Sequence, residues 1–222
     1  MSALTAQLWD GAASLGVPLD AAQLAKFEVL VAELLRWNKA YNLTAITAPA
    51  EILTHHLLDS LSAQPDLAGS TVADVGTGAG FPGLPLAIVN PARQFTLVDA
   101  VDKKLRFIDH VARELELTNV RTTHVRVEQL KPAQAFDTVI TRAFAPLPRL
   151  AAWVAPLCNA QTRVIAMKGR WPPAPAPGNA DADGGPLPAG WHVESVRAVQ
   201  VPSLGEERNI LILRRDAPAG IP

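Results

Sequence analysis

Hydrophobic side chains recur every three or four residues between Asp20 and Asn42, which is the spacing of a helix with one apolar face. The aspartate at the start of this segment is a candidate N-cap. A second stretch with helical spacing runs from about Pro49 to Ala63. The pattern therefore predicts a helical N-terminal cap over residues 1–65. The apolar positions of its first long helix are Leu24, Phe27, Leu30, Val31, Leu34, Leu35 and Trp37.

After residue 65 the pattern changes to short apolar runs. Five of them alternate with helix-like stretches, which favours a parallel sheet with right-handed crossovers. Two late runs, HVESVRAVQV and RNILILRR, have no convincing helix between them and predict an antiparallel hairpin at a sheet edge. We expect an α/β domain over residues 66–222, with a mostly parallel seven-stranded sheet. The five earlier runs are TVADVG, QFTLVDA, NVRTTHV, FDTVITRA and TRVIAMKG.

One segment does not fit either period. Residues 171–190, WPPAPAPGNADADGGPLPAG, are rich in proline and glycine, which disfavour both helix and strand. We predict an exposed, mobile loop there.

Composition limits the class of protein. The chain has 222 residues, 49% of them hydrophobic and 18% charged, which excludes a disordered or collagen-like chain. A single cysteine, Cys158, forms no internal disulfide and no Cys-rich zinc site, so the usage suits a reducing compartment. The N-terminus does not have the pattern of a signal peptide, and no apolar run reaches about 18 residues. We expect a cytoplasmic protein with no membrane partner.

Charge is distributed unevenly along the chain. The formal net charge is −1, yet residues 101–170 contain 12 Lys or Arg and 6 Asp or Glu. Two interpretations stay open: a basic patch that binds nucleic acid, or charges scattered over a solvated surface.

A glycine-rich segment, DVGTGAGFPG from Asp74 to Gly83, follows the first apolar strand and precedes a helical stretch. Glycines let the backbone adopt positive φ and approach a ligand closely, so a nucleotide-like ligand is expected here. The spacing is ambiguous, because it satisfies both G-x-G-x-x-G and G-x-G-x-G. Taken alone, this motif is weak.

Two aspartates flank this loop at the ends of adjacent apolar runs. A carboxylate at Asp74 would repel a pyrophosphate but suits the cationic methionine end of S-adenosylmethionine, either through the loop or through a water. Asp99 is placed to accept hydrogen bonds from two ribose hydroxyls, a role that S-adenosylmethionine and NAD share. The structural alternatives are a turn residue for Asp74 and a helix N-cap for Asp99.

Several unusual segments, in this order, resemble the bacterial small-subunit ribosomal RNA methyltransferase family RsmG, also called glucose-inhibited division protein B. The resemblance runs from about Trp37 to Lys168. It implies a Rossmann-like class I methyltransferase fold, S-adenosylmethionine as cofactor, and methylation of a guanine N7 in 16S rRNA. The motifs are RWNKAYNLTAIT, HHLLDSL, DVGTGAGFPGLPLAIV, LVDAVDKKLRFI, TRAFAPL and MKG.

The resemblance also implies roles for single residues. Arg142 would lie beside the cofactor and the target base, and we expect it to be the catalytic residue that orients the guanine. Asp99 would hold the ribose, and Val127 and Glu128 would flank the adenine. An N-cap for Glu128 and a surface ion pair for Arg142 are the structural alternatives. The expected cofactor-binding set is Asp74, Gly76, Gly78, Phe81, Asp99, Val127, Glu128 and Arg142.

Guanine N7 offers a lone pair and no proton, so no strong general base is required. His55 and His56 are adjacent, so only one of them can face inward on a helix. We expect a hydrogen-bonded structural histidine there rather than a metal site, and His55 is expected to pair with Asp59, four residues further on. An apolar setting for Cys158 disfavours a covalent nucleophile.

The remaining predictions concern partners. Candidate contacts to RNA phosphates are Lys103, Lys104, Arg106, Lys168 and Arg170, with 16S rRNA or the small ribosomal subunit as substrate. We expect a monomer. Two other classes stay open: an NAD-dependent oxidoreductase, for which no Tyr-x-x-x-Lys pair is evident, and a noncatalytic RNA-binding protein with this fold.

Overall fold

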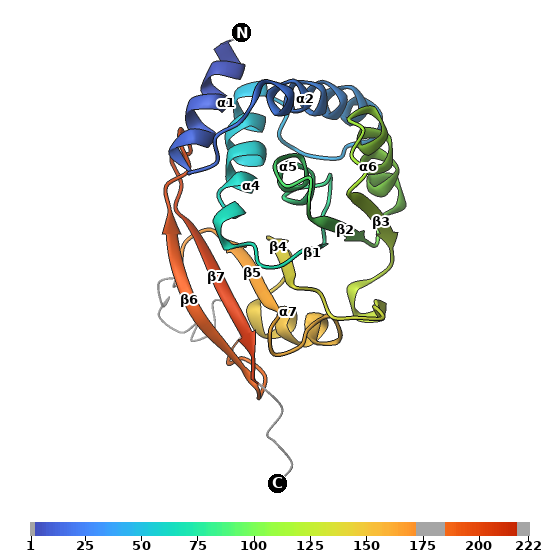
Figure 1. The fold of residues 1–222 in the computed structure, drawn as a ribbon, viewed down its shortest axis with the longest axis vertical. Helices are drawn as coiled ribbons and strands as arrows, with labels where there is room; N and C mark the ends of the chain where they lie inside the picture. Colours follow the sequence, from blue (N-terminus) through green and yellow to red (C-terminus); the bar gives the residue numbers. More distant parts are fainter. Residues whose placement is uncertain (1–2, 172–184, 217–222) are drawn as a thin grey trace.

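A computed structural model describes residues 3–171 and 185–216 of the chain. Within these ranges a seven-stranded sheet has the order β3-β2-β1-β4-β5-β7-β6, with β1 to β5 parallel and β7 antiparallel to both β5 and β6 (Figure 1). The predicted sheet and its C-terminal hairpin are confirmed. The strands are β1 (Thr71–Val75), β2 (Gln94–Asp99), β3 (Val120–His124), β4 (Thr138–Arg142), β5 (Arg163–Lys168), β6 (Trp191–Val199) and β7 (Arg208–Arg215).

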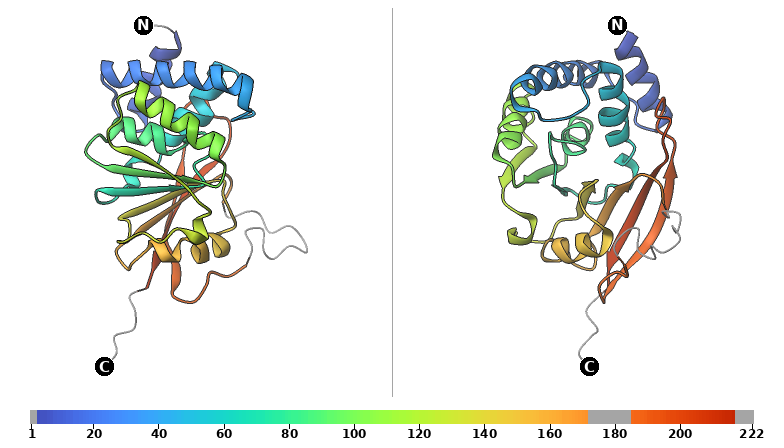
Figure 2. Two further views of the ribbon diagram at one scale, coloured as in Figure 1. Left: turned by 90° about the vertical axis from the view of Figure 1, so that its right-hand side faces the viewer. Right: turned by 180° about the vertical axis from the view of Figure 1, so that it is seen from behind.

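Helices cover both faces of this sheet (Figure 2). Helices α5 (Gly83–Val89) and α6 (Asp102–Glu114) cover one face, and α7 (Leu147–Val154) covers the other. Short 3-10 turns η2 (Gln64–Asp66), η3 (Val127–Gln129) and η4 (Ala155–Leu157) lie between elements. The predicted loop at 171–190 lies mostly outside the described residues.

The inner strands β1, β4, β5 and β7 are buried on both sides, because alternate residues enter different cores. On β1, Val72 belongs to the core under α5 and α6, whereas Ala73 and Val75 belong to the core over α7. The same alternation separates Ile140 from Val139 on β4. Such two-sided burial is what a continuous apolar run in a parallel strand predicts.

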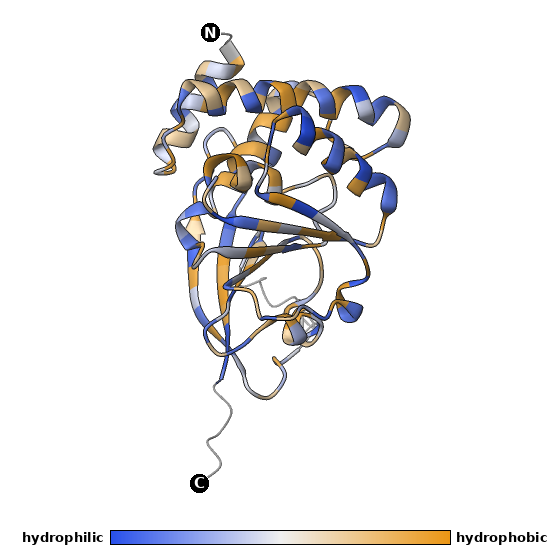
Figure 3. Ribbon diagram, turned by 45° about the vertical axis from the view of Figure 1, so that its right-hand side comes forward, coloured by the Kyte–Doolittle hydropathy of each residue, from blue (hydrophilic) through white to orange (hydrophobic). Residues whose placement is uncertain are grey.

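The N-terminal helices add a further layer over α5 and α6. They are α1 (Ala3–Ser14), α2 (Ala21–Tyr41), α3 (Pro49–Glu51) and α4 (Asp59–Leu61), with a π-helical turn η1 (Ile52–Leu58) between α3 and α4. Asp20 is the N-cap of α2: its carboxylate accepts from the backbone N–H of Gln23, and the Gln23 side chain accepts in return. The prediction that Asp20 is the N-cap residue of this helix is confirmed. Apolar residues of α2 face the layer beneath, and polar ones face outward (Figure 3).

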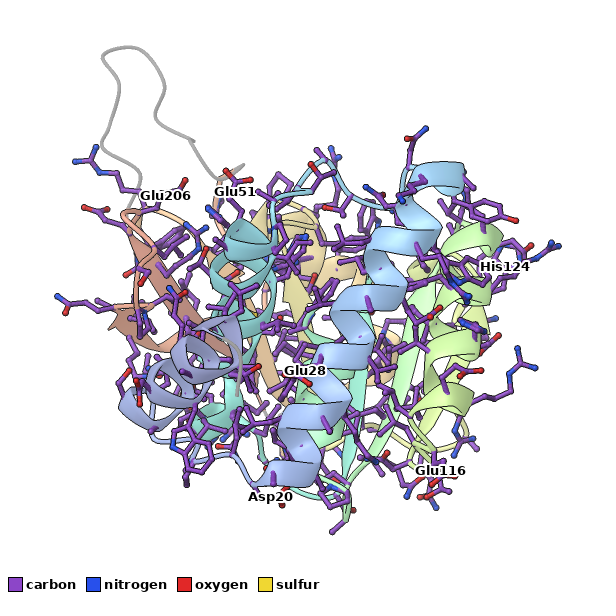
Figure 4. The ribbon with its side chains drawn as sticks, turned by 90° about the horizontal axis from the view of Figure 1, so that it is seen from above. Asp20, Glu28, Glu51, Glu116, His124 and Glu206 are labelled. Carbon is purple, nitrogen blue, oxygen red and sulfur yellow. The ribbon has the colours of Figure 1, made fainter. Side chains whose placement is uncertain are left out.

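Part of the N-terminal helical layer reaches one edge of the sheet. In Figure 4, Glu51 and Glu206 lie at one edge of the molecule, and Asp20 and Glu116 lie at the opposite edge. Arg142, the last residue of the parallel strand β4, donates to His55 of η1 and shares Asp59 with Arg208 at the start of β7, so the first edge is the carboxyl edge of the sheet. The start of β7 and the turn that contains η1 therefore meet at the edge where ligands of doubly wound sheets bind. None of the described helices is long and apolar enough to cross a membrane.

Candidate active site

The glycine loop after β1 is held from below by a buried carboxylate. Asp74 Oδ2 accepts from the Thr77 hydroxyl at 2.6 Å and from the Gly83 N–H at 2.8 Å. Burial raises the pKa of Asp74 to about 6, against the lowering effect of its hydrogen bonds to Thr77 and Gly83 and of the Arg142 charge. Among the described residues, none donates to Asp74 Oδ1. Asp74 therefore shapes the loop from beneath and does not itself line a cavity.

Positive φ angles run through this loop, at +70° for Gly76, +61° for Gly78 and +89° for Gly80. Gly76 has a second reason to be glycine, because a Cβ there would lie 2.2 Å from the Phe144 ring. Positive φ is unfavourable for residues with a Cβ. At position 76 only glycine fits, and the backbone of the loop is therefore exposed to an approaching ligand there.

Asp99 fixes the same loop from the neighbouring strand. Its Oδ2 accepts from the Gly78 N–H and its Oδ1 from the Val101 N–H, both at 2.9 Å. A carboxylate has about four lone-pair sites, so two remain for a ligand. The N-cap of α6 is Val101, without a side-chain cap, so the alternative role of Asp99 as N-cap is wrong.

A cavity of about 430 Å³ opens at this edge of the sheet, within the size range of small-molecule sites. We call it the first cavity. Five of the predicted cofactor residues line it: Gly76, Asp99, Val127, Glu128 and Arg142. The wall also contains Ala143, Phe144 and Trp153, which were not predicted from the sequence. Lys104 lies there too, although it was predicted to contact RNA. The full lining is Gly76, Val98, Asp99, Ala100, Lys104, Val125, Arg126, Val127, Glu128, Arg142, Ala143, Phe144 and Trp153.

This lining fits S-adenosylmethionine. Asp99 offers free lone pairs to hydroxyls, Gly76 allows close backbone approach, and the exposed carboxylate of Glu128 has no partner among the described residues. Val127 is buried and offers an apolar wall. The N-cap of η3 is Arg126, so the alternative role of Glu128 as N-cap is wrong.

Arg142 ends β4 and is anchored by the cap. Its Nη1 donates to the carbonyl oxygen of His55 at 2.6 Å and to Asp59 Oδ2 at 3.0 Å, and its Nη2 lies 3.3 Å from His56 Nδ1. Its side chain is 20% exposed and that of Asp59 only 4%, so this is not the surface ion pair considered as an alternative. Two of the five N–H donors of Arg142 remain available to a ligand.

His56 links Thr44, in the loop after α2, to Arg142. Its ring stacks on Phe81 with centroids 4.6 Å apart, and its Nε2 lies 2.9 Å from Thr44 Oγ1. Its Nδ1 lies 3.3 Å from Arg142 Nη2, which donates, and 3.2 Å from the carbonyl oxygen of His55, which accepts, so these two contacts favour opposite tautomers. Burial, with the nearby Arg142 charge, lowers the pKa of His56 to about 4. His56 is buried and hydrogen-bonded and also borders the second cavity described below, whereas Phe81 packs against its ring and does not line the first cavity.

The π-helical turn places these groups. The sequence spacing predicted a helix over this segment, but not that one turn of it is π-helical. Such π-helical turns often occur at functional sites. It brings His55, His56 and Asp59 to Arg142. The predicted pairing of Asp59 with His55 is wrong: its carboxylate receives Arg142 and Arg208, which are permanently charged and offer more donors.

A second cavity, of about 370 Å³, lies beside the first. The two share Arg142 and Ala143. Ala143 has φ +49°, an uncommon conformation for a residue with a Cβ, and one that occurs at functional sites. The two cavities therefore adjoin at these two residues. The lining of the second cavity is Ile46, His55, His56, Asp59, Arg142, Ala143, Met167, Lys168, Gly169 and Arg208.

The predicted RNA contacts do not form one cluster. Lys104 lies on the wall of the first cavity, 4.0 Å from Asp99, and Lys168 lines the second. Lys103 donates to the carbonyl oxygen of Tyr41. Arg106 and Arg170 are exposed and pair with Asp102 and Glu207. Arg208, which sequence reasoning missed, borders the second cavity because β7 begins at this edge.

Two solved methyltransferases share this architecture. A SAM-dependent methyltransferase from Aquifex aeolicus matches with TM-score 0.54 and 17% identity, over 78% of this chain and 97% of that one. The 16S rRNA methyltransferase KamB matches with TM-score 0.51 and 18% identity, over 70% and 91%. These likenesses confirm the predicted fold class, a Rossmann-like methyltransferase fold.

Sequence comparison identifies the family. The chain belongs to the rRNA small subunit methyltransferase G family, whose model matches residues 23–211. A protein named ribosomal RNA small subunit methyltransferase G from Stutzerimonas stutzeri is 44% identical over 211 residues, 94% of each chain. One of the same name from Pseudomonas paraeruginosa is 43% identical over 222 residues, 98% of this chain and all of that one. The predicted family is confirmed, and neither alternative class is favoured.

Proposed function

We propose that this chain transfers the methyl group of S-adenosylmethionine to N7 of a guanine in 16S ribosomal RNA. The observation that carries the proposal is the pair of adjoining cavities that share Arg142 and Ala143. The first cavity offers the ribose acid and adenine-side residues of a cofactor site, and the second is large enough for a purine. Family membership supports ribosomal RNA as the substrate.

S-adenosylmethionine bound in the first cavity would supply an electrophilic methyl group. Asp99 would hold the ribose, Val127 and Glu128 would flank the adenine, and Gly76 would let the backbone approach. Asp74, Gly78 and Phe81 would act indirectly, by shaping the loop and supporting His56. Proximity and orientation are worth about 7–11 kcal/mol in favourable cases.

Arg142 is the proposed catalytic residue, through orientation of the acceptor guanine. Donation to N7 would compete with methylation, so its free N–H groups would contact O6 or a phosphate instead. Guanine N7 has a lone pair and no proton to remove, so the site needs no general base. This agrees with an acceptor cavity whose carboxylate, Asp59, already pairs with two arginines.

The RNA surface is proposed to follow the carboxyl edge of the sheet. Lys168 and Arg208 line the second cavity, and Lys103, Arg106 and Arg170 lie outside both cavities. Lys104 would face the cofactor more than the RNA. Contacts to phosphates release counterions, so binding of unmethylated RNA should weaken steeply as salt rises. An affinity that does not depend on salt would contradict this surface.

The deciding experiment is transfer of labelled methyl groups from S-adenosylmethionine to small ribosomal subunits that lack the modification. We expect label at one guanine, mapped as N7-methylguanine, and no label on subunits already modified. Label elsewhere would contradict the proposed acceptor. Absence of transfer, with intact RNA binding, would favour the noncatalytic class.

The proposal extends to the organisation of the chain. We propose that residues 1–65 form a helical cap and residues 66–222 the methyltransferase domain, and that the protein acts in the cytoplasm as a monomer. Hydrogen bonds from Arg142 to the cap support a cap that takes part in the site. Sedimentation of the purified chain tests the monomer.

A further inference from the structure

Two guanidinium groups share one buried carboxylate beside the two cavities. Arg142 Nη1 lies 3.0 Å from Asp59 Oδ2, and Arg208 Nε lies 3.1 Å from Asp59 Oδ1. We call Arg142, Asp59 and Arg208 the charge triad; two cations and one anion leave it one positive charge. Glu206 also pairs with Arg208, but at the exposed surface, where water screens it.

The position of Arg142 raises an electrostatic problem. A methyl group that passes from the first cavity to the second crosses at the residues that both share, Arg142 and Ala143. Reacting atoms approach to about 3–3.5 Å, so a sulfonium bound for transfer lies near this junction. A sulfonium and a guanidinium are both cations, and like charges at a partly buried site disfavour each other.

We infer that Asp59 is the counter-charge that lets Arg142 lie beside a sulfonium, and that the net charge of the triad sets the preference for S-adenosylmethionine over S-adenosylhomocysteine. These two ligands differ in the methyl group and its positive charge. Asp59 is a positioning residue, since it acts on the cofactor through Arg142. This inference rests on the proposed function of the first cavity.

The arrangement of the two arginines supports an electrostatic role for Asp59 in addition to its packing. Arg208 binds the opposite carboxylate oxygen from Arg142, so it competes for the same negative charge without lining the first cavity. Removal of Asp59 or of Arg208 therefore changes the charge beside Arg142 in opposite directions. Other charged side chains also lie near the junction, and the test leaves them all in place. They are Asp74 beneath the loop, Asp99, Lys104, Arg126 and Glu128 on the wall of the first cavity, and Lys168 on the wall of the second.

The test is a charge ladder built in the full chain. Asp59→Asn raises the triad by one positive unit, Arg208→Met lowers it by one, and the double variant restores the original charge. Calorimetric titration gives the dissociation constants of both ligands for each. We expect Asp59→Asn to shift the preference toward S-adenosylhomocysteine by on the order of tenfold, the effect of one unbalanced charge a few ångströms away. Arg208→Met should shift it the other way, and the double variant should return near the original ratio.

A second ion pair made by an arginine of the C-terminal hairpin serves as the matched control. Arg197 on β6 pairs with Asp66 of η2, and neither residue lines either cavity. Asp66→Asn and Arg197→Met should leave the ratio of the two dissociation constants unchanged. A similar shift in these controls would overturn the inference.

The outcomes separate the inference from the proposed function. If Asp59→Asn weakens both ligands by the same factor, or changes neither, Asp59 is a structural residue and the inference is wrong. If circular dichroism shows that Asp59→Asn does not fold, Arg208→Met decides alone, because a shift toward S-adenosylmethionine is expected only from charge. If the unaltered chain binds neither ligand, the proposed cofactor site itself fails.

Discussion

Arg142 donates to the backbone carbonyl oxygen of His55 at 2.6 Å, across 87 residues of chain. This bond ties the end of β4 to the π-helical turn of the cap. The side chain that borders both cavities is therefore held by a segment that precedes the sheet, and the cap contributes directly to the site.

Arg142→Ala should lower turnover far more than cofactor affinity. The side chain is the proposed contact to the acceptor, whereas the first cavity keeps Asp99, Val127 and Glu128 in the variant. We expect a loss in kcat of about 100-fold, the cost of a misplaced reactant, without weaker binding of S-adenosylmethionine, because loss of a cation from the charge triad does not disfavour the sulfonium. Methyl transfer to unmethylated subunits and calorimetry give the two quantities.

Arg121→Ala is the matched control, since Arg121 is an exposed arginine on β3 that lines neither cavity. Its kcat should stay at the original value. Equal losses of turnover and cofactor affinity in Arg142→Ala would show that the residue serves the cofactor alone.

Local pattern was sufficient to predict the strands, the capped helix and the glycine loop. Each of these depends on residues close together in sequence, such as Asp20 with Gln23 or the glycines after Asp74. Asp99 was also predictable, because the carboxyl ends of parallel strands meet at one edge.

The second cavity could not be predicted in this way. Arg208 reaches Asp59 across 149 residues, and only the antiparallel course of β7 brings its start to the carboxyl edge. Helical spacing suggested that Asp59 pairs with His55, but it carries no information on a partner from a distant strand. Likewise, burial of Phe81 beneath His56 depends on how the cap packs on the sheet.

Asp99→Ala should weaken cofactor binding. The variant loses the acceptor for the proposed ribose hydroxyls and the two acceptors that hold Gly78 and Val101. Hydrogen bonds to a charged group contribute about 1.5–3 kcal/mol each, so the dissociation constant should rise by at least ~10-fold. Asp102→Ala is the control, because Asp102 forms an exposed ion pair with Arg106. An unchanged dissociation constant in Asp99→Ala would refute the ribose assignment.

Gly76→Ala and Gly78→Ala should differ although both glycines have positive φ. Each substitution pays roughly 1 kcal/mol for the left-handed conformation. A Cβ at Gly76 also meets the Phe144 ring on the cavity wall, whereas a Cβ at Gly78 meets no protein atom within 4 Å. Overpacking adds about 1–3 kcal/mol, so Gly76→Ala should show the larger fall in unfolding free energy. Equal losses, measured by urea denaturation, would mean that Phe144 moves aside freely.

Asp74 and His56 should affect the acid stability of the protein in opposite directions. Burial raises the pKa of Asp74 to about 6 from 3.8, so the folded state binds its proton more tightly. The stability from this group is therefore lost as pH rises from about 4 to 6. Asp74→Asn removes that loss and should leave a protein whose unfolding free energy rises more steeply with pH in this window than that of the original chain. Urea denaturation at a series of pH values measures the slope, and an unchanged slope would contradict the raised pKa.

His56 has the opposite sign, since burial beside Arg142 lowers its pKa to about 4 from 6.5. Between these values the unfolded chain binds a proton that the folded chain does not, so stability is lost as pH falls from 6.5 to 4. At about 1.4 kcal/mol per pKa unit the loss reaches roughly 3 kcal/mol. His56→Gln keeps an acceptor for Arg142 but does not titrate, so its unfolding free energy should fall less between pH 6.5 and 4. The exposed His192, paired with Asp216 far from the site, provides the matched His→Gln control. If stability falls as steeply in His56→Gln as in the control, His56 does not contribute to the pH dependence. Its pKa in the folded protein is then not lowered.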